Sequence, residues 1–164
     1  MTEAEFRGAI ATEAKTWTGT PYHPNGNLKG VGVNCAQFLY CVAKNAGVIP
    51  ADAPDPRRFT AQLAAKTKEE RLVAYIEAYG GKEIAESEVK TGDIIFYRVA
   101  GEHGHTAIVL DWPNVMHSMP INGCQMGLFN EGQLGAKARR YFTLYHPADE
   151  DLSSGARGNP AGSK

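Results

Sequence analysis

The chain lacks several features that would mark a specialised class of protein. It has three cysteines in 164 residues, too few for the disulfide framework of a small secreted scaffold. It contains no run of about 18 apolar residues, so no transmembrane helix is expected. Positive and negative charges nearly cancel, leaving a net charge of −1. This balance predicts no general attraction to nucleic acid or to a membrane surface.

The first residues also lack the basic and apolar regions of a secretory signal peptide. We therefore expect synthesis in the cytoplasm, and any activity outside the cell would need another route of delivery. The composition is that of an ordinary globular protein, 43% hydrophobic and 21% charged. Apolar residues become scarce near the end, so we predict one domain over residues 1–148 and a disordered tail over residues 149–164.

The first half of the chain has helical periodicity. Thr2 and Glu5 form a capping-box pattern ahead of the first apolar stripe. A second stripe follows Asn34, and further helical segments are expected from Asp55 to about Lys66 and from Thr67 to Tyr79.

After residue 90 the spacing of apolar residues changes from that of helices to that of strands. Segments rich in β-branched and aromatic residues lie at residues 93–99, 105–111, 115–118, 125–128 and 139–145. Helices first and strands later predict an α+β fold, in which N-terminal helices pack on a C-terminal antiparallel sheet of about five strands.

The segment from Asn34 to Gly47 indicates where the chemistry lies. Its apolar residues recur at helical spacing, Asn34 is a favourable N-cap, and Gly47 is a typical residue after a helix end. Cys35 is thus predicted in the first turn, where the helix dipole favours the nucleophilic thiolate. A cysteine on an apolar helix face is more often a small buried hydrophobe. Cys41 and Cys124 have no comparable setting and are interpreted as incidental.

A cysteine nucleophile needs a base, and the base needs an orienting partner. His105 and His117 lie on predicted neighbouring strands, and a short hairpin would place them opposite each other on one face of the sheet. One imidazole would then fix the tautomer of the other and direct its far nitrogen toward Cys35. The alternative is a zinc site that also includes His103, but the expected turn at Gly104 and the absence of a Cys-x-x-Cys pair disfavour it. We predict no metal and no cofactor.

Five motifs, in their order along the chain, resemble the NlpC-type cysteine peptidases. They are Gly19-Thr20-Pro21-Tyr22, Asn34-Cys35-Ala36-Gln37-Phe38 after a glycine-rich run, Thr91-Gly92-Asp93-Ile94-Ile95-Phe96-Tyr97, Gly104-His105-Thr106-Ala107-Ile108-Val109-Leu110 and Val115-Met116-His117-Ser118. The resemblance extends from about residue 6 to residue 146. It implies a papain-like core and an enzyme that hydrolyses peptide bonds of the bacterial cell wall.

The resemblance also implies roles for individual residues. Cys35 would be the nucleophile, His105 the general base and acid, and His117 the third, orienting residue. Tyr22 would contact the oxyanion or the substrate. The partner would be a bacterial cell-wall peptide, cleaved at the amide bond between D-glutamate and the diamino acid of the stem.

Three positions depart from the family pattern, which usually has aspartate before the cysteine and Ser-Gly after it. Here these positions hold Asn34, Ala36 and Gln37. Asn34 can still cap the helix, and the missing carboxylate no longer opposes ionisation of the thiol. Together with the missing signal peptide, this variant motif resembles the branch encoded with phage tails and gene-transfer particles.

That branch implies phage tail or particle proteins as further partners, and delivery of the enzyme to the periplasm or cell wall. Two alternative functions remain open. One is an amidase or acyltransferase that uses the same Cys-His dyad on another amide. The other is a structural tail-tip component that keeps the fold without activity.

Overall fold

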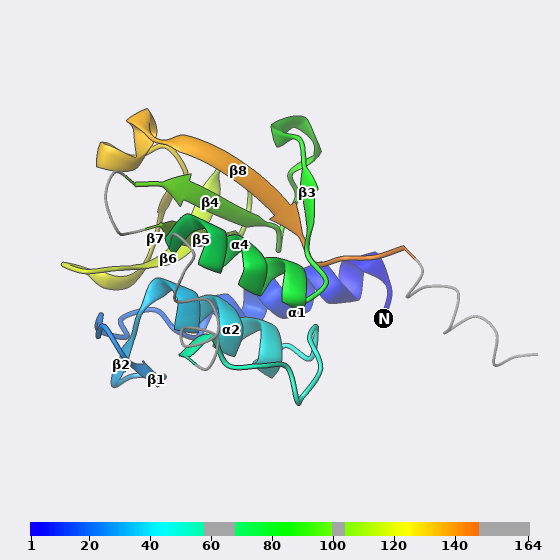
Figure 1. Ribbon diagram of the computed structural model, residues 1–164, viewed down its shortest axis with the longest axis horizontal. Coiled ribbons are helices and arrows are strands. Elements are labelled where there is room, and N and C mark those ends of the chain that lie inside the picture. Colours follow the sequence, from blue (N-terminus) through cyan, green and yellow to red (C-terminus); the bar gives the residue numbers. More distant parts are fainter. Residues whose placement is uncertain (58–67, 100–103, 148–164) are drawn as a thin grey trace, which may run out of the picture.

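The protein is described by a computed structural model that covers residues 1–57, 68–99 and 104–147 (Figure 1). Most of the helical segment predicted after Asp55 and the tail predicted over residues 149–164 lie outside these ranges. Within them, helices gather on one side of an antiparallel sheet (Figure 1). The predicted α+β class is confirmed.

Three α-helices lie wholly within the described ranges, where the periodicity predicts them. They are α1 (Glu3–Lys15), α2 (Cys35–Asn45) and α4 (Lys68–Ala78). The capping box of α1 is complete, because the Thr2 side chain accepts a hydrogen bond from the Glu5 backbone and the Glu5 carboxylate accepts one from the Thr2 backbone. Across the described ranges, the helices are too short or too polar to cross a membrane.

The main sheet has six strands in the order β3-β8-β4-β5-β6-β7, and each neighbouring pair is antiparallel. The strands are β3 (Lys82–Ile84), β4 (Ile94–Arg98), β5 (His105–Val109), β6 (Asn114–Met119), β7 (Gly123–Leu128) and β8 (Ala138–Thr143). The sequence does not predict β3, a three-residue edge strand with no buried side chain. A small second sheet pairs β1 (Asn27–Leu28) with β2 (Gly32–Val33) between α1 and α2.

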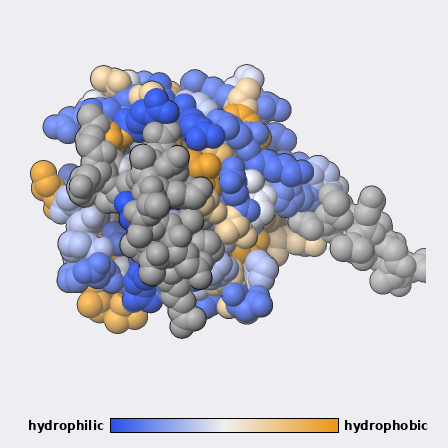
Figure 2. Space-filling model, in the orientation of Figure 1, coloured by the Kyte–Doolittle hydropathy of each residue, from blue (hydrophilic) through white to orange (hydrophobic). Residues whose placement is uncertain are grey.

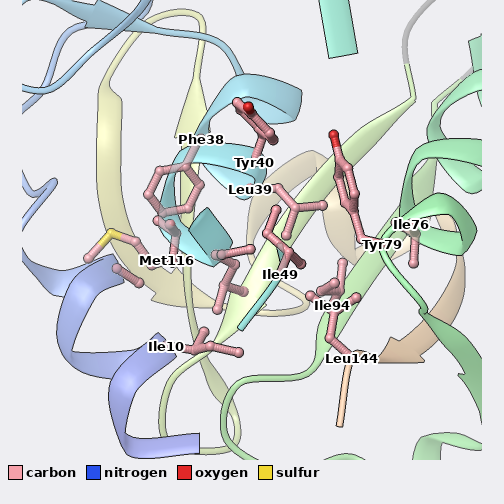
Figure 3. Packing of buried hydrophobic residues seen from close by; sticks show 14 of the residues in the cluster. Ile10, Phe38, Leu39, Tyr40, Ile49, Ile76, Tyr79, Ile94, Met116 and Leu144 are labelled. Carbon is pink, nitrogen blue, oxygen red and sulfur yellow. The ribbon is translucent and has the colours of Figure 1, made fainter. Parts of the chain in front are cut away.

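The two faces of the main sheet carry separate hydrophobic cores. The larger, inner core lies between the sheet and the helices and includes Ile10, Phe38 and Met116, each at most 2% exposed (Figure 3). A smaller, outer core covers the opposite face of the sheet. It consists of Ile95, Tyr97, Ala107, Val109, Val115, Leu134 and Tyr141. Each large side chain buried in this way stabilises the fold by about 1.5–3 kcal/mol.

A short 3-10 helix, η2 (Gly132–Ala136), closes the outer core with Leu134. The face of the molecule seen in Figure 2 is largely hydrophilic outside the grey atoms, with apolar side chains in small separate patches. Scattered apolar side chains of this kind are usual on a globular surface.

Candidate active site

Cys35 is the first residue of α2, as the sequence predicts. Asn34 caps the helix with an extended backbone, and its Oδ1 accepts a hydrogen bond from the Gln37 backbone at 2.8 Å. The Nδ2 of Asn34 donates to the Pro24 carbonyl at 2.6 Å. An aspartate could accept the first bond but could not donate the second. The amide therefore joins the helix start to the preceding loop.

Two contacts hold Cys35 against the start of β5. Its Sγ lies 3.9 Å from the Gly104 carbonyl oxygen, and its own carbonyl accepts a hydrogen bond from Thr106 Oγ1 at 3.1 Å. These two contacts come from the residues on either side of His105. Gly104 is required here for space, since a Cβ at this position would lie 2.7 Å from a ring carbon of Phe96.

His105 and His117 contact each other, as the sequence predicts. The Nε2 of His105 and the Nδ1 of His117 are 3.0 Å apart, and the ring centroids are 5.1 Å apart. Both side chains are buried, at 8% and 5% exposed. The ring nitrogens that take no part in this contact are Nδ1 of His105 and Nε2 of His117.

The predicted register of this hairpin is wrong, although the predicted contact is present. The observed pairs are Ile108 with Met116 and Val109 with Val115, so the two histidines are diagonal neighbours and not directly opposite. The turn determines this register, because the Leu110 backbone N–H donates to the Asn114 carbonyl. Diagonal residues still share one face of the sheet, and large rings can reach across that separation.

Burial lowers the pKa of both imidazoles. Burial and the neighbouring His117 lower the pKa of His105 to about 3. Burial also lowers the pKa of His117, while the nearby Glu131 carboxylate acts in the opposite direction. Both rings are therefore neutral near pH 7, and a neutral imidazole can accept a proton as a general base must.

Tyr22 is held close to the cysteine by the loop that precedes α2. It forms an isolated parallel bridge with Val33, whose carbonyl also accepts a hydrogen bond from Ser118 of β6 at 2.8 Å. Burial and the charge of Cys35 raise the pKa of the Tyr22 hydroxyl. The hydroxyl therefore stays protonated and can donate a hydrogen bond.

The other two cysteines are in settings that disfavour the thiolate. Burial raises the pKa of Cys41 to about 11, and burial raises that of Cys124 to about 11 as well. Cys124 lies on β7 and is part of the inner core. The settings of Cys41 and Cys124 agree with the interpretation of these two cysteines as incidental residues.

The histidine-based zinc alternative depends on His103, which lies outside the described residues. In the three described ranges, no group of three or more His, Cys, Asp or Glu side chains could hold a metal ion. Of the remaining histidines, His23 is exposed and His146 is partly exposed, with its ring against the Gly80 carbonyl.

Two polar residues near this site escape the sequence analysis. Thr106 lies on the same face of β5 as Ile108 of the inner core, so its hydroxyl needs a buried partner, which is the Cys35 carbonyl. A polar residue at an inward position of a predicted strand is a signal that could have identified it. Glu131 lies in a turn after β7, where no periodic pattern marks it.

A cysteine at a helix start, in contact with the residues that flank a buried histidine, is compatible with the Cys-His pairing of papain-like cysteine peptidases. Residues 19–141 match the model of the NlpC/P60 family, and the chain belongs to this family.

Similar proteins agree with this assignment. The chain is 24% identical over 123 residues to a probable endopeptidase NlpC homolog of Haemophilus influenzae, covering 75% of this chain and 55% of that protein. It therefore spans about half the length of this relative. An NlpC/P60 family protein from Bacillus cereus ATCC 10987 has a similar fold, with a TM-score of 0.56, 21% identity, and coverage of 82% of this chain and 39% of that one.

The same fold also occurs without catalysis. RipD from Mycobacterium tuberculosis, a non-catalytic NlpC/p60 domain protein adapted to peptidoglycan binding, has a TM-score of 0.53 and 12% identity, covering 85% of this chain and 98% of that one. Membership of the family therefore does not by itself establish catalysis, which depends on the residues at the site of this chain.

The first expected result concerns thiol reactivity. Cys35 lies at the positive end of the α2 dipole, whereas burial raises the pKa of Cys41 and Cys124. Iodoacetamide at pH 6 should therefore alkylate Cys35 first, by about tenfold or more in rate. Peptide mass spectrometry over a time course measures all three sites in one sample. Equal rates at the three cysteines would contradict an activated Cys35.

Proposed function

We propose that this protein is a peptidoglycan endopeptidase, in which the Cys35 thiolate cleaves an amide bond of the stem peptide. The observation that carries this proposal is the position of Cys35 at the start of α2, in contact with both chain neighbours of His105. The His105 ring in turn is within hydrogen-bond distance of the His117 ring. Membership of the NlpC/P60 family supports the cell-wall substrate.

In the proposed reaction, the Nδ1 of His105 takes the thiol proton while the Cys35 sulfur attacks the carbonyl carbon. The carbonyl electrons move to oxygen and form a tetrahedral oxyanion. Backbone N–H groups at the start of α2 and the Tyr22 hydroxyl would stabilise it, a contribution of about 3–4 kcal/mol for each donor.

The oxyanion then collapses, and the bond between carbon and nitrogen breaks. His105 returns its proton to the leaving amine, which departs with a free amino group, and a thioester to Cys35 remains. Water then attacks the thioester and gives its proton to His105, which transfers it to the departing sulfur. The second product is a free carboxylate, and the enzyme is regenerated.

Two of the three departures from the family motif, Asn34 and Gln37, have hydrogen-bond partners within the protein. Gln37 is 1% exposed, and its Nε2 donates to Asp55 Oδ1 at 2.8 Å, so its side chain points into the protein. Asn34 caps α2 as an aspartate would. We therefore keep the bond between D-glutamate and the diamino acid as the proposed cleavage point.

We also propose that the enzyme acts as part of a phage tail or gene-transfer particle, which delivers it to the periplasm or cell wall. The variant motif Asn34-Cys35-Ala36-Gln37 supports this placement. Detection of the chain in purified particles by mass spectrometry would test it, and its consistent absence from them would contradict it.

Digestion of purified peptidoglycan sacculi tests the proposed reaction directly. We expect stem fragments with a new α-amine on the diamino acid and no new reducing sugar ends, because the residues of the site that the structure describes are a thiol and imidazoles, without a carboxylate pair for glycoside cleavage. Mass spectrometry identifies the bond, and amine and reducing-end assays quantify it. Reducing ends without new amines would contradict a peptidase. Turnover of another amide with intact sacculi would favour an amidase or acyltransferase.

A further inference from the structure

Glu131 lies near His117, the member of the histidine pair on β6. It directly precedes η2, the short helix that closes the outer core. Its Oε2 accepts a hydrogen bond from the Leu128 backbone at 3.2 Å, and its own N–H donates to the Leu128 carbonyl at 3.1 Å. These two bonds fix the carboxylate at the end of β7.

Gly127 leaves the space between this carboxylate and His117 open. A Cβ on Gly127 would lie 2.7 Å from Glu131 Oε2 and 3.9 Å from His117 Nε2. The carboxylate and the imidazole therefore flank the same point in space. Gly127 has no left-handed backbone conformation that would require a glycine. It is required because a side chain at this position would meet the Glu131 carboxylate.

The position of this anion bears on which nitrogen of His117 carries the proton. A neutral imidazole has one N–H donor and one acceptor nitrogen. An anion beside Nε2 favours the tautomer that is protonated there, which leaves Nδ1 to accept a hydrogen bond from His105 Nε2. His105 then carries its own proton on Nε2, and its Nδ1 is free to receive the thiol proton.

We propose that Glu131 is a positioning residue that sets the tautomer of His117, and through it that of His105. The inference rests on the proposed role of Cys35. It adds a fourth side chain to the relay of hydrogen-bonding groups that begins at this cysteine. The relay runs from Cys35 to His105 Nδ1, from His105 Nε2 to His117 Nδ1, and from His117 Nε2 toward the Glu131 carboxylate.

The other polar groups around the pair have different partners. Tyr97 of β4 lies against the His105 ring, and its hydroxyl donates to the Phe129 carbonyl at 2.6 Å. Arg139 of β8 stacks on the Phe129 ring and donates to the Tyr141 hydroxyl at 3.2 Å. Gln125, opposite His117 on β7, is neutral. Among the residues that the structure describes, Glu131 is the negative group whose field acts on His117 against the effect of burial.

The test uses two variants that disturb the carboxylate in different ways. Glu131→Gln removes the charge but keeps an oxygen that can accept from the Leu128 backbone. Gly127→Ala keeps the charge but places a methyl group against Glu131 Oε2. Glu88→Gln is the matched control, since Glu88 also accepts a bond from the backbone three residues earlier, Ala85 N–H at 2.8 Å, but acts on neither histidine.

Nitrogen-15 NMR of the histidines gives a readout that does not depend on activity, and it can be repeated in Cys35→Ala. At pH 7 we expect the wild type and Glu88→Gln to show His117 protonated on Nε2, and both disturbing variants to show a mixture of tautomers. The kcat/KM of Glu131→Gln should fall about threefold to tenfold, because partly solvated outer groups have modest effects.

The outcomes separate this inference from the proposed function. If the wild type leaves sacculi and other amides uncleaved, the proposed function fails, but the tautomer measurement still decides the role of Glu131. If the wild type is active while Glu131→Gln and Gly127→Ala keep the wild-type tautomer and kcat/KM, Glu131 has no positioning role. A variant that melts like the wild type and still shows mixed tautomers would exclude a purely structural effect.

Discussion

Cys35→Ala should abolish the release of amine groups from peptidoglycan sacculi, with a loss of about a thousandfold or more. Alanine preserves the start of α2, because the Asn34 cap depends on the backbone of Gln37 and not on the thiol. The variant should therefore melt like the wild type while lacking the nucleophile. Amine release over time, measured on identical sacculi, is the direct comparison.

The matched control is Cys41→Ala. Cys41 belongs to the same helix, but burial raises its pKa and its Sγ faces the Asn27 carbonyl at 3.7 Å. Its replacement should leave cleavage close to the wild-type rate. Full activity in Cys35→Ala would end the cysteine-peptidase hypothesis. If the wild type itself cleaves nothing, a binding function like that of RipD is the better interpretation.

The second large effect is expected at the histidine pair. His105→Ala should nearly abolish cleavage, since the thiol and its proton acceptor act as one unit. His117 is best tested with two substitutions of similar size. His117→Asn supplies an amide oxygen near the place of Nδ1 and should keep much of the activity, whereas His117→Leu should lose about 10-fold to 100-fold.

The pH dependence of kcat/KM adds a separate check on His105. Burial and His117 hold its pKa near 3, well below the usual value of about 6.5 for histidine. The ring therefore remains able to accept a proton as the pH falls from 7 to 5, and protonation of His105 should not produce an activity loss near pH 6.5. Equal activity in His117→Asn and His117→Leu would show that the hydrogen bond between the rings is not used.

The sequence predicts those parts of the site that depend on local rules. The N-cap at Asn34, the helix that begins at Cys35, and the shared face of His105 and His117 each follow from a pattern a few residues long. Each of these features is confirmed. Their catalytic roles stay predictions until the variants are measured.

What the sequence does not predict depends on tertiary packing. The hairpin register is set by hydrogen bonds within its turn, which alternation alone does not specify. The strand β3 is recruited by pairing with β8 and has no apolar pattern of its own. Glu131 lies near His117 because of the turn after β7 and because Gly127 has no side chain to fill the space between them. No local sequence motif predicts this proximity.

The presence of a separate core on each face of the sheet has a consequence for the thermal loss of the proposed activity. Cys35 belongs to the helical layer, whereas the histidines share their face with the smaller outer core. A small layer with few buried side chains opens more readily than the protein as a whole. Transient lifting of η2 would displace Leu134 and Glu131 while the inner core stays folded and Cys35 keeps its contacts with Gly104 and Thr106. We therefore expect the proposed activity to decline through a subglobal opening of this layer, below the melting temperature of the whole domain.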